Sequence, residues 1–526
     1  MVVCSTGDTA GSRAEVTGKG VTQVPARTGA GGAILIMPYR REMSNDFLLD
    51  RRTPVRHNKS MTNVILKKES PTTAALIVDD PALRWTAAEA LTYPVKGAKY
   101  DPRVRAGIWD GRTCLLTKEG KFPAGLISRV RDVYHEQKIP VTVVDPFEIK
   151  RAEITADSYP YMWDHARGTL RDYQDTAVNA AFNAGSGIVW MGTGTGKSLV
   201  IAALTAMIGA PTLVIVPTKD LLYQMATTLR EWLPDVEIGL LGDGNHQWSP
   251  EVTVATFQTL ARHRDGLWDE LQSVQVVISD EGHHVPAKTW QQTLGSIPAL
   301  YRYVFSATPF TGAGEDLVLE GTVGPVVFTY RGSEAIAGGT LVQPHVWMLE
   351  CSTPVFPQTD AWSDIYQAGI VDNQERNDKL IEATCVAASE WGKTLVIVRS
   401  IAHGAYLTER IAAAGINVAF AQGNTSADMR RRLLRGFAGA QYDVMVSTSI
   451  FDEGVDVPII SAITLAAGGR ADHKTIQRVG RGMRQGGQSK LLVIDTFDTG
   501  EHILARHARA RRSLYQRERW PVEVIR

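Results

Sequence analysis

From residue 170 onward, short apolar runs alternate with longer stretches that have helical periodicity. The runs are apolar along most of their length and end in turn residues, a pattern typical of strands buried on both faces of a parallel sheet. Because strands and helices alternate in two successive sets, the pattern predicts two α/β sheets in tandem. The expected strands are 188–190, 212–216, 252–256, 274–279 and 303–306, then 394–399, 418–421, 443–448, 462–466 and 491–495.

The residues before this region follow other patterns. Residues 1–60 are rich in small polar residues without apolar periodicity, so we expect a disordered extension, and Met61 is a candidate for the true translation start. Short β-like runs and one amphipathic helix in 61–150 predict a small α+β module. We therefore divide the chain into an extension (1–60), the module (61–150), a first α/β domain (160–335), a second (345–500) and a basic helical tail (501–526).

Charge restricts how the chain can hold a polyanion. Its 56 basic and 56 acidic residues cancel, so only local basic patches can attract one. Residues 61–150 contain 14 basic and 11 acidic residues, and the bases concentrate between Lys96 and Arg131. The longest apolar stretch, 201–216, is too short to span a bilayer. Four cysteines without a CxxC pair favour a reducing compartment, and we expect a cytoplasmic protein.

A phosphate-binding loop is expected at Gly194-Thr195-Gly196-Lys197-Ser198, between a strand and an apolar helix. Backbone N–H groups of such a loop point at phosphate oxygens, and the helix N-terminus adds positive potential. Lys197 would reach the β- and γ-phosphates, and the Ser198 hydroxyl would coordinate Mg²⁺. The motif's usual first glycine is replaced by Met191. The expected nucleotide-binding residues here are Gly192, Thr193, Gly194, Thr195, Gly196, Lys197 and Ser198.

Two adjacent acids follow a hydrophobic strand at Asp280-Glu281-Gly282-His283. After a phosphate-binding loop, this arrangement predicts that Asp280 joins Ser198 around Mg²⁺ and that Glu281 activates the attacking water. The neighbouring His283 and His284 have no third or fourth ligand at suitable spacing, which argues against a zinc site.

The acidic motif, with Ser306-Ala307-Thr308, resembles the DExH helicases of superfamily 2, and the resemblance covers about 165–500. It implies two tandem RecA-like motor domains with ATP and Mg²⁺ as cofactors. It further implies that segment 170–174 reads the adenine through Arg171 and Gln174, and that segment 453–458 contributes Asp456. Segment 477–484 would face the γ-phosphate from the second domain through Gln477, Arg481 and Arg484.

The same resemblance implies contacts to a nucleic-acid backbone. Segments 217–219 and 255–258 match strand-tracking motifs, in which Thr218 and Thr256 would donate to phosphates, and Ser447 would do so from the second domain. Such contacts read no bases, so they suit movement along any sequence.

The sequence Gly107-Ile108-Trp109-Asp110-Gly111 narrows the resemblance to the UvsW-like phage helicases, whose small N-terminal module binds double-stranded DNA. The phosphate contacts expected in this module are Arg103, Arg105, Arg112 and Lys121. The alternative is that Trp109 packs in a hairpin core beneath solvated basic side chains. A phage-encoded protein would act in the host cytoplasm.

The leading interpretation is an ATP-dependent DNA helicase that unwinds or remodels duplex or branched DNA in repair, recombination or replication. A DNA translocase subunit of a restriction or remodelling system is the alternative. The nuclease half-motif Glu148-Ile149-Lys150 lacks a convincing upstream partner, which counts against a restriction enzyme. An ATP-gated scaffold without hydrolysis is disfavoured by the full catalytic set. DNA is the expected partner, and the sequence indicates no membrane and no obligate protein partner.

Overall fold

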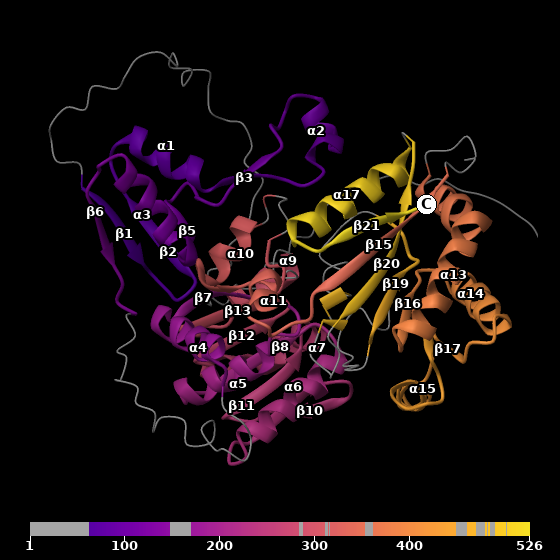
Figure 1. Cartoon of the computed structure of the whole chain (residues 1–526). Helices are drawn as coiled ribbons and strands as arrows, with labels where there is room; N and C mark the ends of the chain where they lie inside the picture. The colour runs from indigo at the N-terminus through magenta and orange to yellow at the C-terminus, as the bar shows by residue number, and fades with distance from the viewer. Residues whose placement is uncertain are drawn as a thin grey trace, which may run out of the picture. The chain divides into compact units, whose positions relative to one another are not determined.

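The computed structural model describes residues 63–147, 170–282, 288–310, 314, 316–352, 361–448, 460–469, 479–480, 482–483, 490–500 and 502–526. The described chain forms two largely parallel sheets flanked by helices, with a small α+β module ahead of them in the sequence (Figure 1). The fold class expected from the sequence is confirmed. The expected extension 1–60 and Met61 lie outside the described residues.

The N-terminal module has a four-stranded sheet in the order β5-β2-β1-β6. Helix α1 begins where Asp80 accepts a hydrogen bond from the Ala82 N–H, and Pro81 occupies the first turn. The apolar sides of α1 and α3 pack on this sheet and form a core that also includes Leu317 of the following domain. The elements are β1 Val64–Lys68, β2 Thr73–Ile77, α1 Pro81–Ala90, β3 Thr92–Pro94, η2 Ala98–Tyr100, α2 Pro102–Arg105, β4 Arg112–Cys114, β5 Lys121–Pro123, η3 Ala124–Leu126, α3 Ile127–Glu136 and β6 Val141–Val144.

The first large sheet has the order β10-β9-β11-β8-β12-β13-β7-β14, and only β10 runs antiparallel to its neighbour. Its strands are β7 Ser186–Met191, β8 Thr212–Val216, β9 Ile238–Gly242, β10 Asn245–Gln247, β11 Val252–Thr256, β12 Val276–Asp280, β13 Tyr301–Ser306 and β14 Val326–Tyr330. Its helices are α4 Asp172–Ala184, α5 Lys197–Ile208, α6 Lys219–Trp232, α7 Phe257–His263, α8 Trp268–Ser273, α9 Lys288–Gly295, α10 Asp316–Val323 and α11 Gly332–Ala337.

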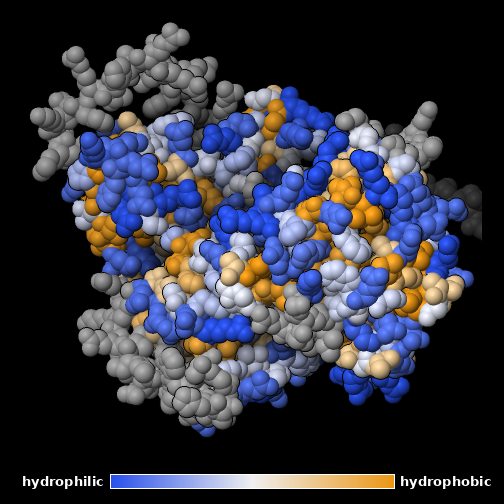
Figure 2. All heavy atoms as spheres, in the orientation of Figure 1, coloured by the Kyte–Doolittle hydropathy of each residue, from blue (hydrophilic) through white to orange (hydrophobic). Residues whose placement is uncertain are grey.

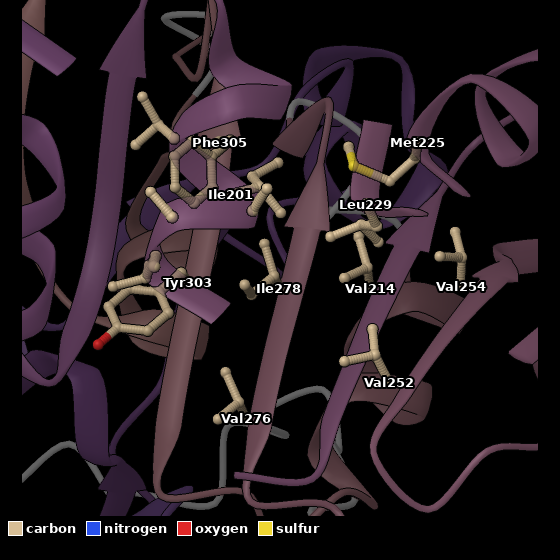
Figure 3. Packing of buried hydrophobic residues seen from close by; sticks show 14 of the residues in the cluster. Ile201, Val214, Met225, Leu229, Val252, Val254, Val276, Ile278, Tyr303 and Phe305 are labelled. Atoms are coloured by element: carbon tan, nitrogen blue, oxygen red, sulfur yellow. The ribbon is translucent and has the colours of Figure 1, made fainter. Parts of the chain in front are cut away.

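The central strands of this sheet are buried along their whole length, as the continuous apolar runs predict. Figure 3 shows Val214, Ile278 and Phe305 of three strands packed with Ile201 of α5 and Leu229 of α6. Helices therefore cover both faces, since a second cluster packs on the opposite side of the same strands. Burial on both faces leaves the strand ends as the places where polar side chains can gather.

The second sheet has the order β17-β18-β16-β19-β20-β15-β21. Its strands are β15 Pro344–Cys351, β16 Thr394–Ile397, β17 Val418–Ala421, β18 Val444–Ser447, β19 Ala462–Leu465, β20 Leu491–Asp498 and β21 Val522–Ile525. Its helices are α12 Trp362–Tyr366, α13 Gln374–Glu390, α14 Ile401–Ala413, α15 Ala427–Ala438 and α17 Ile503–Arg517, and a π-helical turn, η7, spans Gln367–Val371.

The C-terminal segment is more than the basic tail expected for 501–526. Helix α17 does form, but its apolar side, which includes Leu504, Leu514 and Tyr515, is buried. The last strand, β21, pairs in parallel with β15 and completes the sheet edge. The expected division at residue 500 therefore needs correction, because both elements belong to the second α/β domain.

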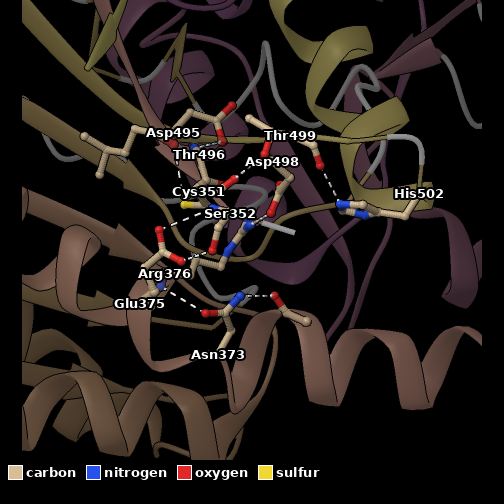
Figure 4. Close-up of polar contacts among 12 residues, drawn as sticks. Cys351, Ser352, Asn373, Glu375, Arg376, Asp495, Thr496, Asp498, Thr499 and His502 are labelled. Atoms are coloured by element: carbon tan, nitrogen blue, oxygen red, sulfur yellow. Dashed lines mark hydrogen bonds and ion pairs between the residues drawn. The ribbon is translucent and has the colours of Figure 1, made fainter. Parts of the chain in front are cut away.

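The second domain also buries charged groups in its core. Arg511 of α17 makes two hydrogen bonds to the Asp495 carboxylate, and the Tyr515 hydroxyl donates to the same carboxylate. A second buried ion pair joins Arg376 of α13 to Asp498 at the end of β20 (Figure 4), and their side chains are 1% and 2% exposed. These pairs fix the two helices to one central strand.

One face of the protein is largely polar (Figure 2). Hydrophilic residues dominate the face seen in Figure 2, and the hydrophobic ones form separate patches. Among the described residues, no helix combines the length and the apolar character that a membrane span requires.

We expect Arg376→Ala to destabilise the second domain by about 3–5 kcal/mol, because the buried Asp498 carboxylate would lose its counter-charge. The measurement is the free energy of unfolding in urea. Arg410→Ala is the matched control, since its pair with Asp378 is about half exposed and should be worth less than about 1 kcal/mol. Equal losses for the two variants would contradict the assigned role of the buried pair.

Candidate ATP and nucleic-acid site

The predicted motifs of the first domain meet at one edge of its sheet. Strands β7, β8, β11 and β12 all run parallel, so their carboxyl ends share that edge. The edge carries the phosphate-binding loop after β7, Asp280 at the end of β12, Thr218 just past β8 and Thr256 at the end of β11. Ligands of open α/β sheets bind at this edge, so the topology brings nucleotide and strand-tracking motifs together.

The phosphate-binding loop ends at Gly196, where α5 begins with Lys197. Gly196 has a φ of +83°, and a Cβ there would lie 2.4 Å from Nε2 of Gln174. Both the left-handed backbone and the close approach therefore require glycine at this position. The loop conformation leaves Lys197 and Ser198 in the first turn of α5, where helix N–H groups favour anions.

Helix α4 holds this loop from the side. The Tyr173 hydroxyl and Nε2 of Gln174 both donate to the Thr195 carbonyl, at 2.9 and 3.0 Å. Oε1 of Gln174 accepts from the Arg171 N–H at 3.0 Å, and Gln174 is 4% exposed. The adenine-reading role of Arg171 and Gln174 stays a prediction, because Gln174 already uses its amide to position the loop.

Tyr173 is a site residue that the sequence reasoning missed. Its ring stacks on Tyr330 of β14, with centroids 4.1 Å apart, while its hydroxyl holds the phosphate-binding loop. It therefore connects the last strand of the sheet to that loop. The sequence offered one indication of this role, because Tyr173 lies within segment 170–174, between Arg171 and Gln174.

The acidic pair lies in a desolvated position. Asp280 is 4% exposed, and burial, together with the neighbouring Glu281 carboxylate, raises the pKa of Asp280 to about 7. The positive charge of Lys197 opposes this rise and lowers that pKa. The Glu281 N–H donates to Oδ1 of Asp280 at 3.0 Å. Two carboxyl groups held this way favour a nearby cation.

The backbone of the acidic motif is constrained at two successive residues. Glu281 has a φ of +54°, an unfavourable conformation for a residue with a side chain. At Gly282, a Cβ would lie 1.8 Å from Cγ1 of Val304 on β13, so only glycine fits. Because Gly282 packs directly against the neighbouring strand, it fixes the direction in which the preceding Glu281 leaves β12.

The residues at this edge fit a nucleotide phosphate and a hard cation. The hydroxyls of Thr193 and Thr308 are buried and have no hydrogen-bond partner within the described structure. The Ser198 hydroxyl and the Asp280 carboxylate are oxygen ligands of the kind that Mg²⁺ prefers, and substrate phosphates and water usually supply the others. The described residues include no group of three or more His, Cys, Asp or Glu that could hold a metal alone.

The residues expected to contact nucleic acid differ in accessibility. Thr218 caps α6 and is partly exposed, whereas Thr256 is 5% exposed and its hydroxyl donates to that of Thr259. Gln258 donates to the Pro217 carbonyl at 2.9 Å and so connects the two motifs. Ser447 is fully buried, and its hydroxyl donates to the Thr448 carbonyl. Their DNA contacts stay predictions.

Several predicted site residues lie outside the described part of the chain. They are Asp456, Gln477, Arg481 and Arg484. Their roles are those that the family resemblance implies.

The four basic residues of the module that are expected to contact DNA fall into two groups, those with a described acidic partner and those without one. Arg103 forms an ion pair with Asp101 at 2.8 Å, and Lys121 forms one with Glu69 at 3.2 Å. Arg105 and Arg112 are exposed, and no described acidic side chain lies within ion-pair distance of either. A phosphate would therefore displace an existing partner at the first two positions but not at the other two.

Known families match three successive parts of the chain. Residues 74–143 match the family described as DNA helicase UvsW, N-terminal. Residues 167–311 match Type III restriction enzyme, res subunit, and residues 375–486 match Helicase conserved C-terminal domain. The order is that of a superfamily 2 helicase with a UvsW-type N-terminal module, which confirms the predicted resemblance.

Curated relatives agree with this assignment. The chain is 26% identical over 400 residues to DNA 3'-5' translocase XPB2 of Sulfurisphaera tokodaii, covering 69% of this chain and 89% of the relative. It is 26% identical over 356 residues to DNA 3'-5' helicase XPB of Kineococcus radiotolerans, covering 64% and 62%. It spans only 54% and 56% of two relatives named Rad25, from Haloarcula marismortui and Halobacterium salinarum.

A solved structure shares the fold. Saccharomyces cerevisiae Dbp5 bound to RNA and ADP BeF3 aligns with 71% of this chain and 94% of its own, with a TM-score of 0.54 and 17% identity. At this identity the likeness concerns the fold alone.

We expect Gly282→Ala to lower stability by about 1–3 kcal/mol, because its Cβ would overlap Val304. It should also lower ATP turnover, since Glu281 would be displaced. Val304→Ala removes the clashing methyl groups, so the double variant should recover part of the lost turnover. Steady-state ATPase rates and thermal unfolding check both effects, and full activity of the Gly282→Ala single variant would contradict the packing argument.

Proposed function

We propose that the chain, which resembles the superfamily 2 helicases, couples ATP hydrolysis to unwinding or remodelling of duplex or branched DNA in repair, recombination or replication. The observation that carries the proposal is the meeting of four motifs at one sheet edge. The phosphate-binding loop, the acidic pair, Thr218 and Thr256 lie at the carboxyl ends of parallel strands. This arrangement supports ATP as the nucleotide, and the match of residues 74–143 to a DNA helicase N-terminal family favours DNA as the partner.

The chemistry follows from the positions of three side chains. Lys197 at the start of α5 neutralises charge on the β- and γ-phosphates, while Ser198 and Asp280 would hold Mg²⁺. When bound, Mg²⁺ neutralises further phosphate charge. Glu281 accepts the proton of the attacking water, and its constrained backbone fixes the direction of its carboxylate. Asp280 is the last residue of β12 and is buried beside β13, so we assign it the role of a Mg²⁺ ligand rather than that of the general base.

Coupling to DNA rests on the neighbouring strands. Thr256 ends β11 and Thr218 follows β8, and β8 pairs directly with β12, which carries Asp280. Any shift of the acidic pair during the ATP cycle is therefore transmitted through one strand to the residues proposed to bind phosphates. Arg481 and Arg484, with Gln477, would complete the ATP site from the second domain and close the two domains on ATP.

A translocase that does not separate strands is the second candidate. The match of residues 167–311 to a restriction-enzyme subunit family favours it, because such a motor can move along duplex DNA for another activity. Strand displacement on forked DNA, measured beside triplex displacement on linear duplex, separates the two candidates. A helicase releases the forked strand, and a pure translocase displaces only the triplex.

We expect Glu281→Gln to bind ATP with near-normal affinity and to hydrolyse it at least about 100-fold more slowly. The amide keeps the shape of the side chain but cannot accept the proton. Lys197→Ala should instead weaken ATP binding as well as turnover, since a phosphate contact is lost. Fluorescent-nucleotide binding and ATPase rates, measured on both variants, check the difference. If Glu281→Gln lost ATP affinity as severely as Lys197→Ala, the general-base role would be wrong.

We expect the double variant Arg105→Ala, Arg112→Ala to reduce the slope of log affinity against log salt on duplex DNA by about 2. Each of these arginines lacks an acidic partner among the described residues and would release about one counterion from the DNA when it binds a phosphate. The matched control replaces Arg103 and Lys121, which already have acidic partners, and should reduce the slope less. Fluorescence anisotropy of the full chain over a salt series measures both. A larger reduction in the control would show that the ion pairs open to bind DNA.

A further inference from the structure

An arm extends from the N-terminal module between β3 and β4. The two strands pair antiparallel, with Thr92 opposite Cys114, and residues 95–111 between them form η2 and α2. We call residues 92–114 the β3–β4 arm. Figure 1 shows α2 at the far end of this arm, away from the α1 and α3 helices of the same module. The arm is too small to have a core of its own, so its side chains are largely exposed.

Two large apolar side chains of the arm face solvent. Tyr100 is 65% exposed and Ile108 is 62% exposed. Elsewhere in the module, Phe122 and Tyr134 are almost completely buried, and Trp85 of α1 and Ile77 of β2 are the largest apolar side chains that are exposed among its described residues. An exposed aromatic ring among basic residues is typical of surfaces that bind single-stranded nucleic acid.

The arm is held in shape by contacts that do not involve these two side chains. Asp101 caps α2 and forms an ion pair with Arg103, which lowers the pKa of Asp101 to about 2. The Arg103 guanidinium lies over the Trp109 ring, 4.9 Å from its centroid, and Trp109 Nε1 donates to the Arg112 carbonyl at 2.7 Å. The arm is therefore organised before any partner binds, which lowers the entropic cost of binding.

The charge of the arm identifies the chemistry of the partner. Residues 95–112 contain five basic and two acidic residues, so they account for the whole excess of +3 found in residues 61–150. Lys96, Lys99, Arg105 and Arg112 are exposed, and one acid of the arm, Asp101, is already paired. Lys99 Nζ lies 4.9 Å from the Tyr100 ring. Cationic side chains without an acidic partner can bind the phosphates of a DNA strand, and an exposed aromatic ring beside them can stack on a nucleobase that is not base-paired.

We propose that the β3–β4 arm binds unpaired bases at a DNA fork, with Tyr100 stacked on a base, Ile108 in apolar contact with it and the four exposed cations on the flanking phosphates. The proposal rests on the proposed function, because it assumes that the chain acts on DNA. It gives the module a task beyond phosphate binding. Phosphate contacts alone cannot distinguish a fork from a duplex, whereas stacking requires a base outside the helix.

The test uses the full chain and measures how a protein substitution and a change in the DNA affect binding, separately and together. Wild type and Tyr100→Ala are each bound to a fork with normal bases, to the same fork with abasic nucleotides at the first unpaired positions, and to a duplex. Tyr100→Ala should bind the normal fork about tenfold more weakly, as expected for one lost stacking contact, and the abasic fork and duplex as wild type does. Ile108→Ala should show the same pattern with a smaller loss.

Two controls isolate the stacking contact. Tyr100→Phe keeps the ring and should bind the normal fork as wild type does. Trp85→Ala removes an aromatic side chain that is 66% exposed on α1, outside the arm, and should change nothing.

Equal losses of affinity for Tyr100→Ala on all three DNAs, or no loss on any of them, would overturn the stacking proposal. DNA-stimulated ATPase of the wild type is measured in parallel. Its absence would refute the proposed function itself, whereas its presence with an insensitive Tyr100 would refute the arm's role alone.

Discussion

Two carboxyl groups at the end of a wholly buried strand are the constraint on which the first domain depends. Asp280 closes β12 in a desolvated position beside Glu281, and this raises its pKa toward neutrality. Such a pair is unfavourable unless positive charge lies close by. Lys197 supplies part of that charge, and a bound Mg²⁺ would supply the rest. The site is therefore built to gain stability when its cation and nucleotide bind.

The surrounding contacts hold the phosphate-binding loop and the acidic pair in fixed positions relative to each other. Tyr173 and Gln174 of α4 hold the phosphate-binding loop through one carbonyl, and Tyr330 of β14 supports Tyr173 by stacking. Gly282 packs against Val304 of β13, a strand that also pairs with β7. Strand β13 thus lies between the two halves of the site. Its position explains how motifs separated by more than 80 residues in sequence can act on one phosphate.

Charge is used differently in the other parts of the chain. The second domain buries two of its ion pairs, in which Arg376 and Arg511 join helices to β20. The N-terminal module instead exposes its excess cations on the β3–β4 arm, although the chain as a whole is neutral. Buried pairs give one fixed geometry, while exposed unpaired cations stay available to a polyanion. A chain without net charge can in this way present one surface that attracts a polyanion.

The sequence by itself determined the fold class and most of the large-sheet strands, and it supplied the candidate residues of the ATP site, because buried parallel strands and glycine-rich loops leave strong local patterns. Tertiary structure alone decided the rest. Strands β9, β10, β14, β15 and β21 escaped sequence reasoning, and three of them, β10, β14 and β21, lie at sheet edges, where a strand is defined by its pairing with a distant segment. Sequence reasoning also missed Tyr173, whose role comes from its contacts with Tyr330 and Thr195. It could not tell which basic residues of the module have an acidic partner, because that depends on whether Asp101 or Glu69 lies within reach. Local patterns record which residues prefer burial or a turn, but a partner across the fold is defined only when the chain has closed on itself.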